Sequence, residues 1–172
     1  MCAASSGPGA TNLVTAIADA RLDSIPLVAI TAQVPRALIG TDAFQEVDTC
    51  AIAIPVTKQS FFVDSAAKLL EIVPRAFQVA LSGRPGPVLI DIPKDVFAET
   101  AEVAVWPQPA GRDALPSPTP NQLARAVAML DEARRPVLYL GGGIVHSGAA
   151  AKAVALAEKL SLPTTMTLMA LG

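Results

Sequence analysis

Two glycine-rich turns have the composition of sites where the backbone approaches a ligand. The stretch GGGIVHSG, residues 141–148, follows a strand-like run and precedes a helix-like one, which is the context of a phosphate-binding turn. Because glycine has no Cβ, Gly141, Gly142 and Gly143 would let a ligand come close to the backbone. The dinucleotide-binding fingerprint GxGxxG, however, would need a glycine where His146 stands. A nucleotide contact and a plain strand-to-helix turn both remain open on these residues.

The other turn, SSGPGATN at residues 5–12, lies directly ahead of a run that reads as a helix. A chain that bends so sharply before a helix could hold a ligand at the bend. Ser5 and Ser6 are also residue types that cap helices or form turns. On residue types alone, a structural turn that caps the helix is the favoured interpretation.

Three further side chains have the chemistry to contact a small molecule. Gln45, beside Phe44 in TDAFQE, can hydrogen-bond either a ligand or its own loop. Lys58 could serve a site or be an ordinary solvated strand residue, and Arg84 in SGRPGPV could meet a phosphate or hold a loop carbonyl. His146 is the only histidine, and no Ser/Asp partners or metal ligands stand at a suitable spacing from it in the sequence. We therefore expect its side chain to be solvated. The sequence contains no Ser/His/Asp set, zinc-ligand spacing or Walker loop.

Composition favours a globular protein of the reducing cytoplasm. Of 172 residues, 52% are hydrophobic and 16% are charged, and the net charge of −2 gives no footprint for nucleic acid. No apolar run approaches the roughly 18 residues that cross a bilayer, and the first residues do not resemble a secretory signal. Cys2 and Cys50 show neither a metal-binding nor a disulfide spacing. We therefore expect neither nucleic acid nor a membrane as a partner.

The elements that would position these residues predict an α/β fold with a parallel sheet, because helical periodicity alternates with continuous apolar runs. We expect a helix over 10–22, strands over 25–32 and 56–63, helical structure over 65–83, and a turn and strand over 82–93. Since proline disrupts a helix interior, the helical stretch should be two helices, with Pro74 in the first turn of the second. We expect no strand before Ser5, because residues 1–4 leave no room for one.

The composition of the sequence changes between residues 99 and 119, where prolines accumulate and apolar periodicity is lost. Such a segment is typical of an extended, stiff linker between domains. A second α/β pattern follows the linker. It predicts helices over 121–133 and 149–160 and strands over 135–143 and 162–169.

Several motifs together resemble the large catalytic subunits of acetohydroxyacid synthases, also called acetolactate synthases. They are SGPGATNLVTAIADARLDSIPLVAITAQVP, IGTDAFQEVD, the TK pair at 57–58, SGRPGPVLIDIPKDV, RPVLYLGGGIVHSG and LPTTMTLMALG. The similarity covers essentially the whole chain in the family's order. GPGATN and SGRPGPV are shared widely among thiamine-diphosphate enzymes, whereas TDAFQE and TLMALG narrow the resemblance to this family and close kin.

The resemblance implies a place for each segment in a three-domain α/β fold. Residues 1–98 would be the C-terminal part of the pyrimidine-binding domain, and 99–119 the linker. Residues 120–172 would be the N-terminal part of the Rossmann-like central domain, which holds FAD. Both ends of the chain then look cut, so we expect an internal fragment of a longer protein.

Catalytic roles also follow from the resemblance. Gln45 resembles the glutamine that reaches the thiamine and the reacting oxygen, Phe44 the phenylalanine of the substrate pocket, and Lys58 the lysine at the pocket mouth. The positions that resemble the substrate channel, where inhibitors dock on family members, are Pro35, Ala43 and Lys94. The SGPGATN turn would lie at the edge of the thiamine site, near a subunit interface.

For the flavin, the resemblance implies contacts from both halves of the chain. Arg84 matches an arginine that contacts FAD. Gly141, Gly142 and Gly143 match a backbone cradle for it. Thr167, Leu168 and Met169 match the end of a strand that runs along the flavin.

The parent enzyme would use thiamine diphosphate, Mg²⁺ and FAD, with the cofactor carrying the chemistry. It would decarboxylate pyruvate and join the hydroxyethyl unit to a second 2-ketoacid, the first common step of isoleucine, valine and leucine biosynthesis. The resemblance further implies a homodimer or tetramer and allows a small regulatory subunit.

Two parts of the family's machinery are absent from this sequence. The glutamate that acts on the thiamine would precede Met1, and the motif that holds the metal would follow Gly172. We therefore assign no metal ligand and expect the isolated chain to be inactive. The alternatives are another thiamine-diphosphate carboligase or oxidase, or a non-catalytic module for nucleotide binding or assembly.

Overall fold

We describe the chain from a computed structural model, in which residues 1–108 and 116–171 are placed. The chain divides into two compact units, Met1–Leu115 and Pro116–Gly172, and each is described by itself. The predicted linker over 99–119 lies partly outside the described residues, at 109–115. Its described parts, 99–108 and 116–119, form neither helix nor strand.

The first unit is built on a parallel sheet, as the sequence predicts. Within the described residues the strands lie in the order β1-β2-β4-β3, and every neighbouring pair is parallel. Their bounds are Cys2–Ala4 for β1, Leu27–Gln33 for β2, Gln59–Phe62 for β3 and Pro87–Pro93 for β4. The expectation that no strand precedes Ser5 is wrong, because β1 pairs with β2 from Cys2 opposite Ala29 to Ala4 opposite Thr31.

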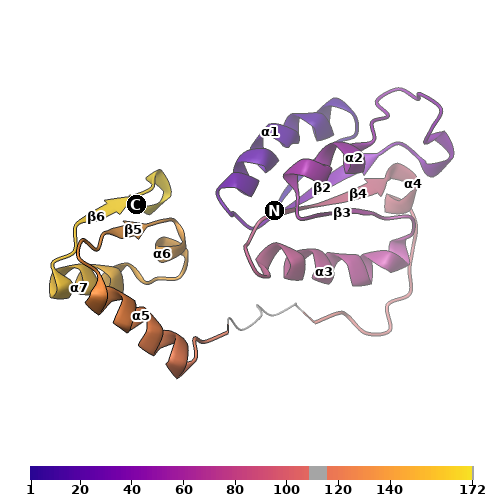
Figure 1. The fold of residues 1–172 in the computed structure, drawn as a ribbon. Coiled ribbons are helices and arrows are strands. Elements are labelled where there is room, and N and C mark those ends of the chain that lie inside the picture. Colours follow the sequence, from indigo (N-terminus) through magenta and orange to yellow (C-terminus); the bar gives the residue numbers. More distant parts are fainter. Residues whose placement is uncertain (109–115, 172) are drawn as a thin grey trace. The chain divides into compact units, whose positions relative to one another are not determined.

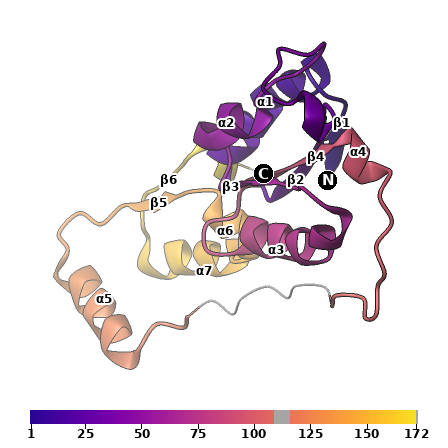
Figure 2. The same cartoon turned by 90° about the vertical axis from the view of Figure 1, so that its right-hand side faces the viewer.

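Helices cover both faces of this sheet (Figures 1 and 2). On one face lie α1 (Pro8–Leu22) and α2 (Thr49–Ala53), where Ile17 packs with Ala29 and Leu89. On the other lies α3 (Leu69–Leu81), where Ala76 packs with Val88. Successive strand residues point to opposite faces. The polar residues Thr31, Gln33 and Asp91 therefore share the α1 face with Ala29 and Leu89.

Helix α3 differs from the prediction of two helices divided at Pro74. A 3₁₀ turn at Ala66–Lys68 leads into one continuous helix that contains this proline. An interior proline costs about 3 kcal/mol. Apolar side chains on both sides of it pack against the same core, and this burial offsets the cost. They are Leu69, Ile72 and Val73 before the proline, and Ala76, Val79 and Ala80 after it.

Short elements complete the connections of the first unit. A 3₁₀ turn at Arg36–Leu38 follows β2, and another at Ile54–Val56 follows α2. The one-turn helix α4 (Lys94–Phe97) follows β4 directly. The turn after β2 and helix α4 place charged and aromatic side chains at the carboxyl edge of the sheet.

The second unit begins with α5 (Pro120–Glu132), whose start is fixed by a capping box between Thr119 and Gln122. A parallel strand pair follows, β5 (Leu138–Leu140) and β6 (Thr164–Met166), with α6 (Gly143–His146) and α7 (Ala150–Leu160) between the strands. A 3₁₀ turn at Leu168–Ala170 comes after β6. The short helix α6 inside GGGIVHSG was not predicted. Among helices in the described residues, none is long and apolar enough to cross a bilayer.

Candidate active site

The carboxyl ends of β1, β2 and β4 meet at one edge of the four-stranded sheet, and a hollow of about 400 Å³ opens there. In open parallel sheets this is the edge where ligands bind. The walls come from the turn after β1, the loop after β2 and helix α4 after β4. Five of the residues predicted for the site lie together in it: Pro35, Ala43, Phe44, Gln45 and Lys94.

The turn after β1 forms one wall of this hollow. The N-cap of α1 is Gly7 rather than Ser5 or Ser6, and both serines line the hollow instead. Gly7 has φ +60°, and a Cβ on it would lie 2.7 Å from the Cβ of Gln45. Pro8 then occupies the first helical position. Only glycine fits here, so the turn and the loop of Gln45 are packed directly against each other.

The TDAFQE loop is folded around the carboxylate of Glu46. This carboxylate accepts hydrogen bonds from the backbone N–H groups of Gly40 and Ala43, the latter at 3.0 Å. Those backbone donors hold the pKa of Glu46 below its usual range. Gln45 itself has φ +63°, a strained conformation of the kind that clusters at functional sites. Phe44 is 89% exposed, so the loop presents its aromatic ring outward.

A buried polar cluster that sequence reasoning missed lies beneath this loop. Asp91 of β4 is 1% exposed and accepts hydrogen bonds from the Thr31 hydroxyl at 2.6 Å and from Gln33 Nε2 at 3.2 Å. Burial raises the pKa of Asp91 to about 6. It also raises the pKa of the nearby Cys50 thiol to about 12, with the charge of Asp91 contributing. The available signal was a polar residue within each apolar run, LVAITAQ and PVLIDIP.

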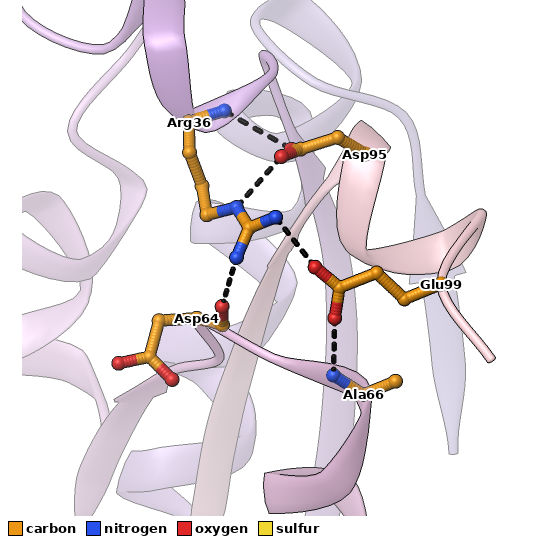
Figure 3. A network of polar contacts seen from close by, with 5 residues as sticks. All are labelled: Arg36, Asp64, Ala66, Asp95 and Glu99. Carbon is orange, nitrogen blue, oxygen red and sulfur yellow. Dashed lines mark hydrogen bonds and ion pairs between the residues drawn. The ribbon is translucent and has the colours of Figure 1, made fainter. Parts of the chain in front are cut away.

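Arg36 holds together the three segments that follow β2, β3 and β4 (Figure 3). Its Nε donates to Asp95 Oδ2 at 2.6 Å, its Nη2 to Glu99 Oε1 at 2.5 Å, and its Nη1 to the carbonyl of Asp64 at 2.5 Å. The Glu99 carboxylate also accepts from Ala66 N at 2.9 Å. The Arg36 guanidinium holds the pKa of Asp95 below its usual range. Arginine suits this place because its planar fork can serve several acceptors at once.

Lys58 lies at the opposite edge of the sheet from the hollow, just before β3 begins. Its ammonium donates to the carbonyls of Val79 and, at 2.6 Å, of Ser82, at the C-terminal end of α3. A cation there complements the helix dipole. Partial burial, with a contribution from Arg21, lowers the pKa of Lys58. The structure therefore does not bring Lys58 together with Gln45 and Phe44, and its bonds are those of a helix cap.

Arg84 also lies at that opposite edge, in the turn that leads into β4. Its Nε donates to the Ser24 hydroxyl at 2.7 Å, and its Nη2 to the carbonyl of Leu22 at 2.8 Å. The guanidinium thus closes the C-terminal end of α1. Arg84 remains exposed, so part of its fork faces solvent.

In the second unit the predicted flavin residues come together at the carboxyl ends of β5 and β6. An added Cβ would lie 3.9 Å from Thr167 Oγ1 at Gly141 and 3.0 Å from the Met169 Cβ at Gly142. At Gly143 it would meet open space in the described part of the chain. Leu168 is 82% exposed. At the two strand ends the backbone is thus open at Gly141 and Gly143 but closely covered by Met169 at Gly142.

No three His, Cys, Asp or Glu side chains gather as a metal-binding group within residues 1–108 and 116–171. Family models nonetheless match both ends of the chain. The N-terminal TPP-binding domain of thiamine pyrophosphate enzymes matches residues 1–52, and the central domain of the same enzymes matches residues 123–172. The chain belongs to the thiamine pyrophosphate enzymes.

Curated relatives match this chain over its full length. It is 58% identical over 172 residues to the acetolactate synthase isozyme 1 large subunit of Escherichia coli. It is 50% identical over 176 residues to the acetolactate synthase large subunit of Corynebacterium glutamicum, and 49% identical over 177 residues to the chloroplastic acetolactate synthase 1 of Zea mays. These alignments cover 100% of the chain but 30%, 28% and 27% of the three relatives.

Proposed function

We propose that this chain is part of the catalytic subunit of an acetolactate synthase, which decarboxylates pyruvate and ligates the resulting two-carbon unit to a second 2-ketoacid. The observation that carries the proposal is the 58% identity to an acetolactate synthase large subunit along the entire chain. The meeting of Pro35, Ala43, Phe44 and Gln45 with Lys94 in one hollow supports it, because Lys94 lies about fifty residues further along the chain.

The hollow suits the organic part of thiamine diphosphate. It combines apolar walls with the polar groups of Ser5, Ser6 and Gln45, a mixture that matches an aromatic ring with hydrogen-bonding edges. Thiamine diphosphate, when bound, supplies the electron sink for decarboxylation. Gln45 would orient the ring or the reacting oxygen by hydrogen bonds, and Phe44 would shield the substrate from water.

Access to the site would involve the remaining residues of the hollow. Pro35, Ala43 and Lys94 would line the substrate channel, with the Lys94 ammonium attracting the carboxylate of a 2-ketoacid. Lys58 has no part in this channel in our proposal, because its ammonium is bonded to the end of α3. The described residues offer no fitting set for Mg²⁺, and we route no step through a metal.

FAD would bind elsewhere on the chain. The open backbone at Gly141 and Gly143, with Thr167, Leu168 and Met169 beside it, suits close approach of a flat cofactor. Arg84, exposed in the first unit, would provide a further contact. Gly142 fits less well, since a Met169 atom already lies 3.0 Å from where its Cβ would be.

The larger assembly is also part of the proposal. Residues 1–98 would belong to the pyrimidine-binding domain, 99–119 to a linker and 120–172 to the central domain. The catalytic subunits would form a homodimer or tetramer in the cytoplasm, with a small regulatory subunit as a further possible partner. We expect the 172-residue chain by itself to be inactive.

Acetolactate formation by the full-length protein that contains this segment tests the proposed function. The purified protein is incubated with pyruvate, Mg²⁺ and FAD, with and without thiamine diphosphate, and acetolactate is measured after conversion to acetoin. We expect product that depends on thiamine diphosphate. Turnover of pyruvate without carbon–carbon bond formation would instead indicate a different thiamine enzyme and overturn the proposal.

A further inference from the structure

A buried polar relay connects the sheet to the loop that carries Gln45. The relay runs from the Asp91 carboxylate to Gln33 Nε2, and from the same Nε2 to the carbonyl of Val47 at 2.6 Å. We propose that Asp91 and Gln33 are positioning residues, which hold the 39–47 loop in the conformation that presents Phe44 and Gln45 to the hollow. The effect of these residues on the rate of acetolactate formation rests on the proposed function, whereas their effect on the loop conformation does not.

The hydrogen bonds around Gln33 allow its carboxamide only one orientation. Its two N–H groups serve Asp91 Oδ2 and the Val47 carbonyl, and its oxygen accepts from Val34 N at 2.8 Å. A flipped carboxamide would place an acceptor oxygen against a carboxylate and a carbonyl. The side chain is 5% exposed, so water cannot readily replace these partners. Asp91 and the Val34 N–H therefore fix together the orientation in which Gln33 donates to Val47.

Asp91 is itself held in place from the neighbouring strand. Thr31 stands opposite it in the β2–β4 register and donates to its other oxygen. Burial of a carboxylate is unfavourable, and the titratable groups that face Asp91 from the loop and α2 are Glu46, Asp48 and Cys50, none of them a cation. A neutral residue would be more stable at this place, so the charge is retained for what it orients.

The relay reaches the strained part of the loop through Val47. Val47 lies two residues after Gln45, whose positive φ places its backbone against Gly7. The Val47 carbonyl also accepts from Thr49 N at 2.8 Å, which ties the loop to the start of α2. Gln33 lines both the hollow with Gln45 and a second one, of about 470 Å³, with Glu46 and Asp91. It therefore separates the two hollows and supports the loop between them.

Amide hydrogen exchange of the loop, measured by mass spectrometry on the full-length protein, tests the inference without requiring activity. The reporters are the loop amides that the structure bonds internally: Gly40, Thr41, Ala43 and Glu46. The variants are Gln33→Leu, which removes the relay, and Asp91→Asn, which keeps its shape without the charge. Thr57→Val is the matched control, because it removes an equally buried hydroxyl bond, to Ala53 O at 2.8 Å, at the opposite edge of the sheet.

We expect Gln33→Leu to speed exchange of these amides by at least about ten-fold, because the Val47 carbonyl and the buried Asp91 carboxylate both lose a hydrogen-bond donor. Asp91→Asn should speed it several-fold, since a charge-assisted bond becomes a neutral one, without lowering the unfolding midpoint at pH 8. Thr57→Val should leave loop exchange unchanged. If Gln33→Leu does not fold, Asp91→Asn still tests the inference. Faster loop exchange in this variant, with an unfolding midpoint that is not lowered, would support the role of the relay. Equal loop exchange in Asp91→Asn and the unsubstituted protein would overturn the inference.

The rate of acetolactate formation adds the kinetic test. We expect kcat for Asp91→Asn to fall in parallel with the rise in loop exchange, while Thr57→Val keeps the unsubstituted rate. Absence of acetolactate in the unsubstituted protein would count against the proposed function alone, because the exchange result would still decide the role of the relay. Faster loop exchange in Asp91→Asn with unchanged kcat would refute the claim that the relay supports catalysis by positioning the loop.

Discussion

The two edges of the four-stranded sheet use charged and polar residues for different purposes. At the carboxyl edge, the loop around Gln45 has strained backbone, an exposed aromatic ring and a buried carboxylate beneath it. At the amino edge, Lys58 and Arg84 bind the last carbonyls of α3 and α1. The carboxyl edge holds groups in conformations that lower stability. At the amino edge, the cationic side chains stabilise the C-terminal ends of helices.

Residue type alone therefore does not identify a site in this chain. Lysine and arginine are the residues one first suspects of binding anionic ligands, yet Lys58 and Arg84 satisfy helix ends. The candidate site is marked instead by a glutamine with φ +63° and by an aspartate buried beneath its loop. Strain and burial, rather than charge, distinguish the candidate site.

The largest effect should come from Gly7→Ala. The added Cβ would lie 2.7 Å from the Cβ of Gln45 and within 2.9 Å of its backbone, at a φ that alanine disfavours. We expect the free energy of unfolding to fall by about 4 kcal/mol. Gly83→Ala, at φ +50° with open space around it in the described residues, should lose only about 1 kcal/mol. Urea unfolding followed by the fluorescence of Trp106, the only tryptophan, measures both; equal losses would contradict the close packing of turn and loop.

Asp91→Asn should change how stability depends on pH. The folded-state pKa of Asp91, about 6, exceeds its ordinary value of 3.8, so the folded protein holds this proton more tightly. Its contribution to stability is therefore full below about pH 4 and is lost as pH rises through 6, by about 3 kcal/mol in total. The variant should gain stability over the unsubstituted chain as pH rises from 4 to 8. A difference between the two that stays constant across this range would show that Asp91 does not titrate there.

Lys58→Met should destabilise the chain without affecting catalysis. Loss of the two bonds to the end of α3 should lower the free energy of unfolding by about 1–2 kcal/mol. Lys68→Met is the matched control, because its exposed pair with Asp64 lies at the other end of the helix and should contribute little. A large fall in kcat for Lys58→Met, with normal stability, would return this lysine to the catalytic residues.

The smallest effect should come from Arg36→Lys, which tests the exposed clamp of Figure 3. Lysine keeps the charge but cannot serve Asp95, Glu99 and the Asp64 carbonyl together. We expect a slightly lower melting temperature, with a difference that shrinks as salt is added. A loss that is independent of salt would indicate that packing of the side chain, rather than its ion pairs, holds the three segments.

Much of the fold was predictable, because the apolar runs of β2 and β4 and the periodicity of α1 and α7 are local signals. The three-residue strand β1 was missed because it is too short to show a pattern. The break at Pro74 was wrong because tertiary packing overrides a local preference. These errors concern elements whose stability comes from their neighbours.

The site was predictable only in part. Five of the residues that line the hollow were implied by the resemblance to acetohydroxyacid synthases, and their meeting follows from strands that end at one edge. The relay joins residues 58 positions apart, Gln33 and Asp91, and each alone reads as an unremarkable polar residue in a strand. Only the pairing of β2 with β4 reveals it.

Gln45 at the carboxyl edge is the residue on which the proposed activity depends most directly, and a pair of glutamine variants tests its role. In the full-length protein, kcat for acetolactate formation is compared between Gln45→Ala and Gln59→Ala, which alters the first residue of β3 at the amino edge. We predict a loss of about 100-fold or more for the former, as when a group that contacts the reacting atoms is removed, and less than about two-fold for the latter. Similar rates for the two variants would contradict the placement of the active site in this hollow.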